Sequence, residues 1–151
     1  MIRNLFQSAD GAARYAAGRA YVHPLFMKRL KPWLSGTASG ADVVCGTGLS
    51  SMGLAELVQE VRAFASVAML EHALPHPRVT YAQAPAEALP LPDVSLDVLT
   101  VSQGIHWFDR LRFYAEARRT LKPGGVLAVD DLFFRGQLEH HPDFHVWMDT
   151  A

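Results

Sequence analysis

The stretch Asp42-Val-Val-Cys-Gly-Thr-Gly48 decides the fold, because it joins a short apolar run to two closely spaced glycines. A strand that ends in a glycine turn lets backbone amides approach a bulky ligand, since no Cβ stands in the way. Apolar residues recur with helical spacing from Leu49 to Val61, which predicts a helix after the turn. This order of elements is typical of nucleotide-type cofactor sites. The glycine pair alone is weak evidence, because an ordinary tight turn has the same composition.

Size and composition predict a single cytoplasmic domain. The chain has 151 residues, one cysteine (Cys45) and a formal net charge of −1. A lone cysteine cannot form an intrachain disulfide, and no apolar run approaches the roughly 20 residues that span a bilayer. Arg3 and Asp10 interrupt any N-terminal leader peptide. We therefore expect a cytoplasmic protein without a membrane partner.

The charge pattern argues against nucleic acid as a partner. Phosphate contacts need clustered Lys and Arg. The nearest cluster is Arg110, Arg112, Arg118 and Arg119. Their helical spacing and the apolar residues between them predict a solvated helix face instead.

Strands and helices alternate along the rest of the chain. Helix is expected over the alanine-rich residues 12–20, with a break at His23-Pro24 and a restart over 25–34. Further strands are predicted at 61–64, 79–82, 96–102 and 126–129, helices at 69–73 and 110–121, a proline-rich loop at 85–92 and a turn at 122–125. Five strands separated by helices predict an α/β fold, a Rossmann-like doubly wound parallel sheet with helices on both faces.

The chain divides into three expected parts. Residues 1–40 form a helical cap, 41–135 the cofactor-binding core and 136–151 an incomplete C-terminal segment. On this interpretation the last strands of the fold are missing. Strand 126–129 would then be an exposed apolar edge that a second copy of the chain could cover as a homodimer.

Four motifs in one order resemble those of the class I S-adenosylmethionine-dependent methyltransferases, in the small-molecule group called methyltransferase type 11. They are the glycine turn at 42–48, Ala86-Glu87-Ala-Leu-Pro-Leu-Pro-Asp93, Ser95-Leu-Asp97 and Leu121-Lys-Pro-Gly-Gly125. Ser102-Gln103-Gly-Ile-His106-Trp-Phe-Asp109 is similar to the end of strand four in enzymes that resemble trans-aconitate methyltransferase. The resemblance covers nearly the whole chain. It implies S-adenosyl-L-methionine as cofactor and methyl transfer to a small-molecule acceptor.

The resemblance also implies roles for single residues. The cofactor would be bound by Asp42, Cys45, Gly46, Gly48, Ala86, Glu87, Ser102 and Gln103. Asp42 would bind the ammonium of the cofactor or order the turn. Tyr15, Arg19 and Trp107 would form a lid or contact the substrate. Arg19 could bind an anionic substrate, or it could lie on a solvated helix face.

His106 is the candidate catalytic residue. Its imidazole could take a proton from a hydroxyl or an amine, or orient the substrate. A structural histidine packed against Trp107 is the alternative, because a carboxylate acceptor needs no base. Positioning supplies most of the catalysis, since the nucleophile must lie in line with the S–CH₃ bond at about 3–3.5 Å.

Departures from the family pattern bear on activity. The family ends strand two with an acid that binds the ribose hydroxyls, and here the run matches only if one residue is missing between Phe64 and Ala65. Val44 stands where the family has Gly or Ala, and its side chain would crowd the cofactor. A second hypothesis is therefore a truncated or degenerate member without catalysis that acts as a binding or interaction domain. An NAD-dependent oxidoreductase is third, because it would need a glycine where Ser50 and Ser51 stand.

No metal site is expected. His140, His141 and His145 include one pair at i, i+4. Neither a nearby Cys nor the Glu of a His-Glu-x-x-His motif accompanies them.

Overall fold

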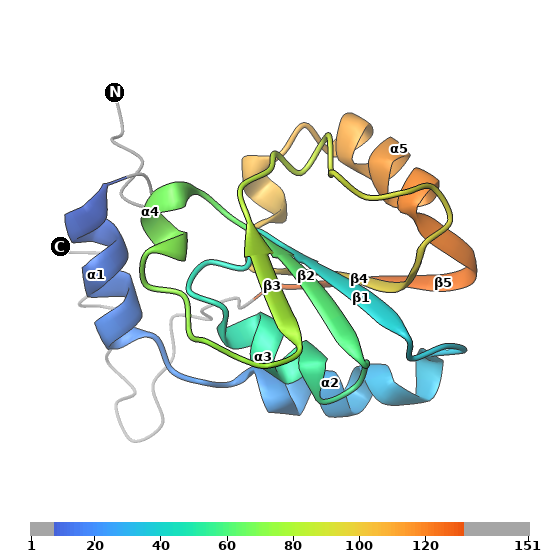
Figure 1. The fold of residues 1–151 in the computed structure, drawn as a ribbon, viewed down its shortest axis with the longest axis horizontal. Coiled ribbons are helices and arrows are strands. Elements are labelled where there is room, and N and C mark those ends of the chain that lie inside the picture. The colour runs from blue at the N-terminus through green and yellow to red at the C-terminus, as the bar shows by residue number, and fades with distance from the viewer. Residues whose placement is uncertain (1–7, 132–151) are drawn as a thin grey trace, which may run out of the picture.

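The computed structural model describes residues 8–131, which form a five-stranded parallel sheet of order β3-β2-β1-β4-β5 (Figure 1). The strands are β1 (Ser39–Val43), β2 (Glu60–Phe64), β3 (Val79–Ala82), β4 (Leu96–Ser102) and β5 (Leu121–Asp130). The helices are α1 (Ala9–Gly18), α2 (His23–Leu30), α3 (Leu49–Ala55), α4 (Val67–Leu70) and α5 (Arg110–Thr120), with 3-10 turns η2 (Lys31–Trp33) and η3 (Ile105–Trp107). The predicted parallel α/β sheet is confirmed.

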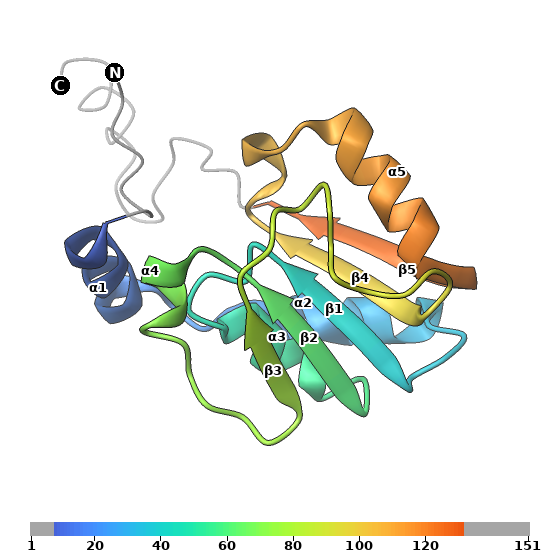
Figure 2. The same ribbon diagram turned by 45° about the horizontal axis from the view of Figure 1, so that its top comes forward.

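Helices cover both faces of the sheet, as predicted. α2 packs against α3, and α3 packs against β1 and β2, whereas α5 lies on the opposite face and contacts β5 (Figure 2). α1 contacts α4, which directly follows β2, so both helices lie beyond the carboxyl ends of the strands. In an open α/β sheet this edge is where ligands bind.

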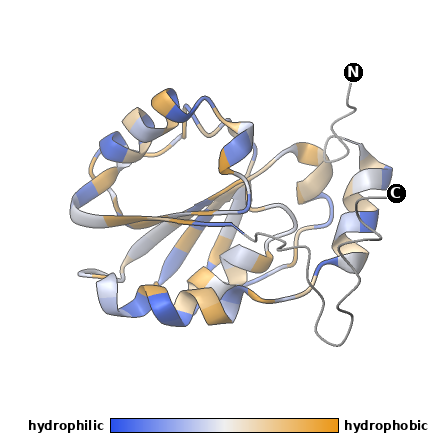
Figure 3. Cartoon of the chain, turned by 180° about the vertical axis from the view of Figure 1, so that it is seen from behind, coloured by the Kyte–Doolittle hydropathy of each residue, from blue (hydrophilic) through white to orange (hydrophobic). Residues whose placement is uncertain are grey.

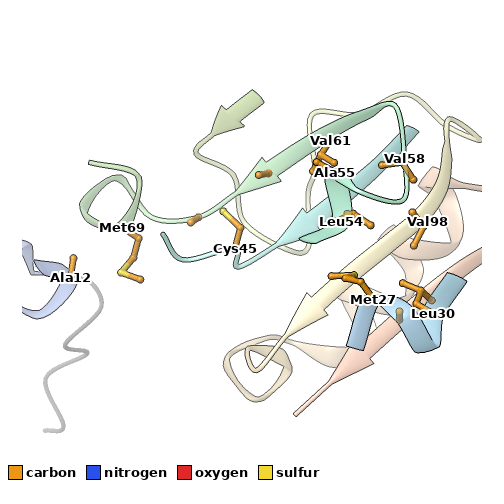
Figure 4. Close-up of a cluster of buried hydrophobic side chains, with 13 residues drawn as sticks. Ala12, Met27, Leu30, Cys45, Leu54, Ala55, Val58, Val61, Met69 and Val98 are labelled. Atoms are coloured by element: carbon orange, nitrogen blue, oxygen red, sulfur yellow. The ribbon is translucent and has the colours of Figure 1, made fainter. Parts of the chain in front are cut away.

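Two apolar clusters fill the layers between helices and sheet. The first packs α2 and α3 against the sheet (Figure 4); its members are Ala12, Met27, Leu30, Cys45, Leu54, Ala55, Val58, Val61, Ala63, Ala65, Met69, Val98 and Ala128. The second packs α5 and contains Ala41, Val43, Phe64, Ala86, Leu89, Leu96, Leu99, Val101, Phe113 and Ala117. The helices carry alternating hydrophilic and hydrophobic stretches (Figure 3), which is typical of helices with one face on a sheet. β4 is buried on both faces, which explains why apolar residues on both faces accompany its polar Asp97 and Thr100.

The break near the start of the chain lies before Pro24, not at it. α1 ends at Gly18, and α2 begins at His23 with Pro24 in its first turn. A proline in the first turn costs no helical hydrogen bond, since that N–H has no partner within the helix. The predicted restart at Leu25 was therefore late by two residues.

The helix after the glycine turn is shorter than predicted. α3 ends at Ala55 instead of continuing to Val61. Gln59 N donates to Thr37 O at 2.9 Å, and the next amide donates to Ala38 O at 3.2 Å, so the chain is drawn into β2. The apolar periodicity continues past the helix because Val58 and Val61 both enter the core.

Two further boundaries differ from the prediction. α4 begins at Val67 and ends at Leu70, ahead of the expected 69–73. β5 starts at Leu121, because Leu121 pairs with Leu96 of β4; the residues predicted as a turn, 122–125, lie between this pair and the next one, Val98 with Val126. A register shift between Leu96 and Val98 accommodates that segment, in which Gly124 has φ +77°.

Several expectations fall partly or wholly outside residues 8–131. The C-terminal segment 136–151 and the three histidines at 140, 141 and 145 lie there. Within the described residues, no helix is long and apolar enough to cross a membrane, and no group of three His, Cys, Asp or Glu could hold a metal ion. The helical cap over 1–40 stays a prediction, although α1 and α2 lie inside it.

Candidate active site

A cavity of about 440 Å³ opens at the carboxyl ends of the strands. Small-molecule sites have volumes of roughly 300–1,000 Å³. The walls come from α1, the glycine turn, the ends of β2 and β4, and the loop after β3. They consist of Tyr15, Arg19, Val44, Gly46, Ala65, Ser66, Met69, Ala84, Pro85, Ala86, Glu87, Ser102, Gln103, His106, Trp107 and Phe108. The cavity thus lies where the strand order reverses about β1.

Most of the predicted site residues meet at this cavity. Those that line it are Tyr15, Arg19, Gly46, Ala86, Glu87, Ser102, Gln103, His106 and Trp107. Asp42, Cys45 and Gly48 do not line it.

Asp42 lies beneath the glycine turn and orders it. Its fully buried carboxylate accepts hydrogen bonds from Ser50 Oγ and Ser51 Oγ, both at 2.6 Å, and from Thr100 Oγ1 at 2.9 Å. Burial raises the pKa of Asp42 to about 6, although these hydroxyls act in the opposite direction. Of its two predicted roles, the structure supports turn ordering and not contact with a ligand in the cavity.

Cys45 and Gly48 do not line the cavity, so their contact with a cofactor stays a prediction. The Cys45 side chain is buried, which raises the pKa of its thiol. Gly48 has φ +88°, and a Cβ at this position would overlap the hydroxyl of Tyr81. That hydroxyl donates to Leu74 O at 2.8 Å. The second glycine of the motif therefore makes room for Tyr81.

Gly46 and Val44 are the turn residues that face the cavity. A Cβ at Gly46 would stand 3.2 Å from Met69 Cε, so the lack of a side chain at Gly46 leaves this space to the cavity. Val44 has φ +57°, which is a genuine outlier for a β-branched residue. Gly104 accommodates it, because a Cβ at Gly104 would lie 3.0 Å from Val44 Cγ1. The Val44 side chain thus stands in the wall of the cavity, where crowding was expected.

A polar cluster joins α1 to the ends of β4 and β5. Arg19 Nη2 donates to Gln103 Oε1, and the Arg19 guanidinium lies 5.6 Å from the ring centroid of Tyr15. Ser102 Oγ donates to Asp130 Oδ2 at 3.0 Å. Arg19 Nε, Gln103 Nε2 and Asp130 Oδ1 are buried without a hydrogen-bond partner among residues 8–131. Such atoms cost free energy, and two of them belong to residues that line the cavity, which indicates a binding role.

Backbone geometry and electrostatics mark the same cluster. Gln103 has φ +57°, a left-handed conformation that non-glycine residues adopt mostly where surrounding structure or function demands it. Burial raises the pKa of Asp130, while the Ser102 hydroxyl and the positive charge of Arg19 oppose the shift. Arg19 therefore is not the solvated helix arginine of the alternative hypothesis.

His106 and Trp107 form the exposed rim of the cavity. Their ring centroids lie 5.0 Å apart with an interplanar angle of 44°. This contact is the packing that the structural alternative predicts for His106. The position on the rim is also the one that a group orienting a substrate requires.

The cavity wall at the end of β2 carries no carboxylate. Ala65 and Ser66 line it, while Phe64 is buried in the cluster beneath α5. Among the described lining residues, Glu87 is the one acidic side chain, and its Oε1 accepts from Asp109 N at 2.9 Å. In the folded protein, the residues that line the cavity directly after β2 therefore offer no carboxylate to a ribose.

Sequence reasoning did not assign several lining residues to the site. They are Ala65, Ser66, Met69, Ala84 and Pro85. Their side chains carry little distinctive chemistry, so motif spacing could not find them. Their place directly after β2 and β3 was the available signal, because the carboxyl ends of parallel strands share one edge.

Comparison with known proteins agrees with this geometry. The methyltransferase domain family matches residues 41–129, more than half of the chain. The chain therefore belongs to the class I S-adenosylmethionine-dependent methyltransferases, whose cofactor is S-adenosyl-L-methionine.

Individual relatives share about a third of their aligned residues with this chain. A malonyl-[acyl-carrier protein] O-methyltransferase of Hahella chejuensis is 34% identical over 111 residues, which are 69% of this chain and 40% of that protein. An uncharacterised methyltransferase of Mycobacterium bovis is 34% identical over 130 residues, which are 82% of this chain and 50% of that protein. The chain thus spans half or less of the length of these relatives.

A solved structure shares the fold. A protein of Anaeromyxobacter dehalogenans, described as a type II methyltransferase, superposes with a TM-score of 0.67 at 42% identity. The superposition covers 72% of this chain and 48% of the other.

Proposed function

We propose that this chain binds S-adenosylmethionine in the 440 Å³ cavity and transfers its methyl group to a small-molecule acceptor. The observation that carries the proposal is the convergence of the glycine turn, both strand ends and the β3–β4 loop on that cavity. When bound, the cofactor supplies an electrophilic methyl group on a positively charged sulfur. The protein then has to hold two molecules in line and keep water out.

The donors without a partner fit the amino-acid end of the cofactor. Arg19 Nε and Gln103 Nε2 both need an acceptor, and a carboxylate offers two oxygens. Gly46 lets the backbone pass close beneath this end. Ala86 and Glu87 form the wall on the adenosine side, and Ser66 lines the cavity two residues after the end of β2.

The name of one relative favours an acidic acceptor. The charges of the described lining residues do not decide this, because Glu87 balances Arg19. The name of the Hahella relative specifies O-methylation of a malonyl group, which carries a carboxylate. A carboxylate acceptor loses no proton on methylation, so His106 would orient it. A hydroxyl or amine acceptor would instead need His106 as a base.

Apolar side chains would exclude water from the reacting atoms. Met69, Trp107 and Phe108 give the cavity an apolar wall beside its polar lining residues, and such a wall binds water weakly. The same side chains restrict how an acceptor can approach, which favours one orientation of the nucleophile.

Ligand binding tests this proposal directly. Titration calorimetry and thermal unfolding would be measured with S-adenosylmethionine and with S-adenosylhomocysteine. A ligand at a hundred times its Kd adds about 2.7 kcal/mol, which raises the midpoint by several degrees for a chain of this size. We expect Arg19→Gln to weaken binding and Arg14→Gln, on the exposed side of the same helix, to leave it unchanged. Absence of binding by the unmodified chain to both ligands would overturn the proposal.

The second candidate is a non-catalytic member of the family that acts as a binding or interaction domain. The wall at Ala65 and Ser66 favours it, because a lost charged hydrogen bond to ribose costs about 1.5–3 kcal/mol, or roughly ten- to hundred-fold in affinity. The Val44 side chain adds a steric restriction. This candidate predicts no methyl transfer to any acid, hydroxyl or amine panel, even at saturating cofactor.

An exposed edge strand completes the proposal for partners. β5 pairs with β4 alone among the described strands, and Val129 is 41% exposed. We propose that a second copy covers this edge. Light scattering on the full chain would then give a dimer mass, and Val129→Lys would reduce it to that of a monomer. A monomeric mass for the unmodified chain at all concentrations would contradict the dimer.

A further inference from the structure

The loop between β3 and β4 supplies one wall of the cavity. Its residues Ala84, Pro85, Ala86 and Glu87 all line the cavity. The loop contains neither helix nor strand, so its shape depends on contacts with the rest of the protein. Those contacts come mainly from α5.

The far end of this loop is held by two charged side chains of α5, which we call the loop clamp (Glu116 and Arg119). Arg119 Nη1 donates to Leu91 O at 2.8 Å and to Asp93 Oδ1 at 2.6 Å, and Nη2 donates to Leu89 O at 3.1 Å. Glu116 Oε1 accepts from Leu89 N at 2.6 Å. The clamp therefore reaches the loop backbone at three points and one of its side chains.

The two members of the clamp also fix each other. Arg119 Nε donates to Glu116 Oε2 at 2.8 Å, and Nη2 donates to Oε1 at 2.6 Å. The hydrogen bonds from Arg119 lower the pKa of Glu116, and both acidic partners raise the pKa of Arg119. The expectation of a solvated helix face was wrong for Arg119, because its side chain is only 33% exposed and bonds to the loop.

The near end of the loop is held at the start of α5. Glu87, which lines the cavity, accepts from the backbone N–H of Asp109, the N-cap of that helix. Ala86, next to Glu87, and Leu89 are also buried in the same apolar cluster as Phe113. One rigid helix thus sets the position of the whole loop.

We propose that Glu116 and Arg119 are positioning residues for the cavity, which set its affinity for the adenosyl cofactor through Ala86 and Glu87. The proposal rests on the proposed function of the cavity. Neither side chain of the clamp lines the cavity, so neither is a catalytic residue. A loop that is already ordered loses less conformational entropy when a ligand binds, and therefore binds more tightly.

The test compares cofactor affinity with the order of the loop. Full-length Arg119→Gln, Arg119→Lys and the control Arg118→Gln, an exposed neighbour on α5, would be titrated with S-adenosylhomocysteine well below their melting temperatures. Hydrogen exchange of peptides that cover residues 84–93 would be measured on the same samples without ligand. We expect Arg119→Gln to raise Kd roughly ten-fold and to speed exchange in the loop, with a smaller change for Arg119→Lys. Arg118→Gln should match the unmodified chain in both measurements.

Asp93→Ala keeps the proposal testable if Arg119→Gln does not fold. Asp93 is exposed, so its removal releases one bond of the clamp without opening the core. We expect faster loop exchange and a Kd two- to three-fold higher. An unchanged Kd in the folded variants would overturn the proposal. If the unmodified chain binds no S-adenosylhomocysteine, the proposed function fails instead, while loop exchange still reports whether the clamp orders the loop.

Discussion

The two ends of the sheet treat buried carboxylates in opposite ways. At the amino end, Asp97 accepts from Ala38 N at 2.8 Å, Ser39 N at 2.9 Å and Lys122 Nζ at 2.8 Å. At the carboxyl end, Asp130 keeps one oxygen buried without a partner among residues 8–131. The amino end uses its acid to hold the chain together, whereas the carboxyl end leaves polar atoms unpaired beside a cavity.

The pKa directions follow from this difference. Burial alone would raise the pKa of Asp97, but the hydrogen bonds from Lys122 and two backbone amides outweigh it, so the pKa is lowered. Burial dominates at Asp42 and Asp130, whose pKa values are raised. Partners therefore decide the direction of the shift at Asp97. At the carboxyl end burial decides it, because Asp42 is fully buried despite its three hydroxyl donors and Asp130 has one buried oxygen without a partner among residues 8–131.

The largest effect is expected at the amino end. Asp97→Ala leaves two backbone amides and Lys122 without their acceptor, so the free energy of unfolding should fall by about 3 kcal/mol at neutral pH. Because the pKa of Asp97 is lowered, this contribution is present above about pH 4 and is lost as the pH falls through the folded-state value. Urea unfolding measures it, with the exposed Asp10→Ala as control. Equal losses of unfolding free energy in Asp97→Ala and Asp10→Ala would show that the hydrogen bonds of Asp97 do not stabilise the amino end of the sheet.

A smaller effect, opposite in pH dependence, is expected beneath the glycine turn. The pKa of Asp42 is raised to about 6 in the folded state, so its contribution to stability falls as the pH rises from about 4 to about 6. Asp42→Asn should abolish this change, and relative to the unmodified chain it should gain about 2 kcal/mol between those pH values. Thermal unfolding at pH 4 and pH 7 tests it. A constant difference between the two proteins would mean that the pKa of Asp42 is the same in the folded and unfolded states.

An acid placed after the end of β2 should increase the affinity of the cavity for S-adenosylmethionine. Ser66→Asp places a carboxylate in the cavity wall, and aspartate also suits the N-cap position that Ser66 occupies at α4. We expect Kd for S-adenosylmethionine to fall about ten-fold, since a charged acceptor binds ribose hydroxyls better than a serine does. Calorimetry measures the change. Ser8→Asp makes the same substitution at the N-cap of α1 and should leave Kd unchanged.

The smallest effect should separate stability from binding at a single residue. Gln103→Gly removes an unpaired amide from a position with φ +57°, but it also removes the acceptor of Arg19 Nη2, so the free energy of unfolding should change by no more than about 1 kcal/mol. Affinity for S-adenosylhomocysteine should fall in the same variant. Gln59→Gly, where φ is not positive, should lose about 0.5–1 kcal/mol. A large loss of stability in Gln103→Gly would show that Gln103 serves the fold.

Much of the fold could be predicted, because the buried parallel strands are rich in apolar residues and alternate with helices along the chain. The end of α3 could not. Val58 and Val61 continue the apolar spacing, but hydrogen bonds of Gln59 to the distant Thr37 decide where the helix stops. Local periodicity carries no information about such long-range partners.

The candidate site also contains residues that the sequence could locate and residues that it could not. Ser102 and Gln103 reach the cavity because they end a central strand, a position that sequence motifs can locate. Asp42 points away from it, toward Thr100 on the neighbouring strand, and only the pairing of β1 with β4 reveals this. The role of Arg119 depends on loop residues about thirty positions away, which helical spacing alone could not indicate.

The buried thiol of the glycine turn has a practical consequence. Cys45 is the only cysteine in the sequence, its side chain is 5% exposed, and its thiol has a raised pKa. Alkylating reagents attack the exposed thiolate, so they should modify only molecules in which the turn has opened. The alkylation rate of Cys45 should therefore measure how often the glycine turn opens, without any introduced label.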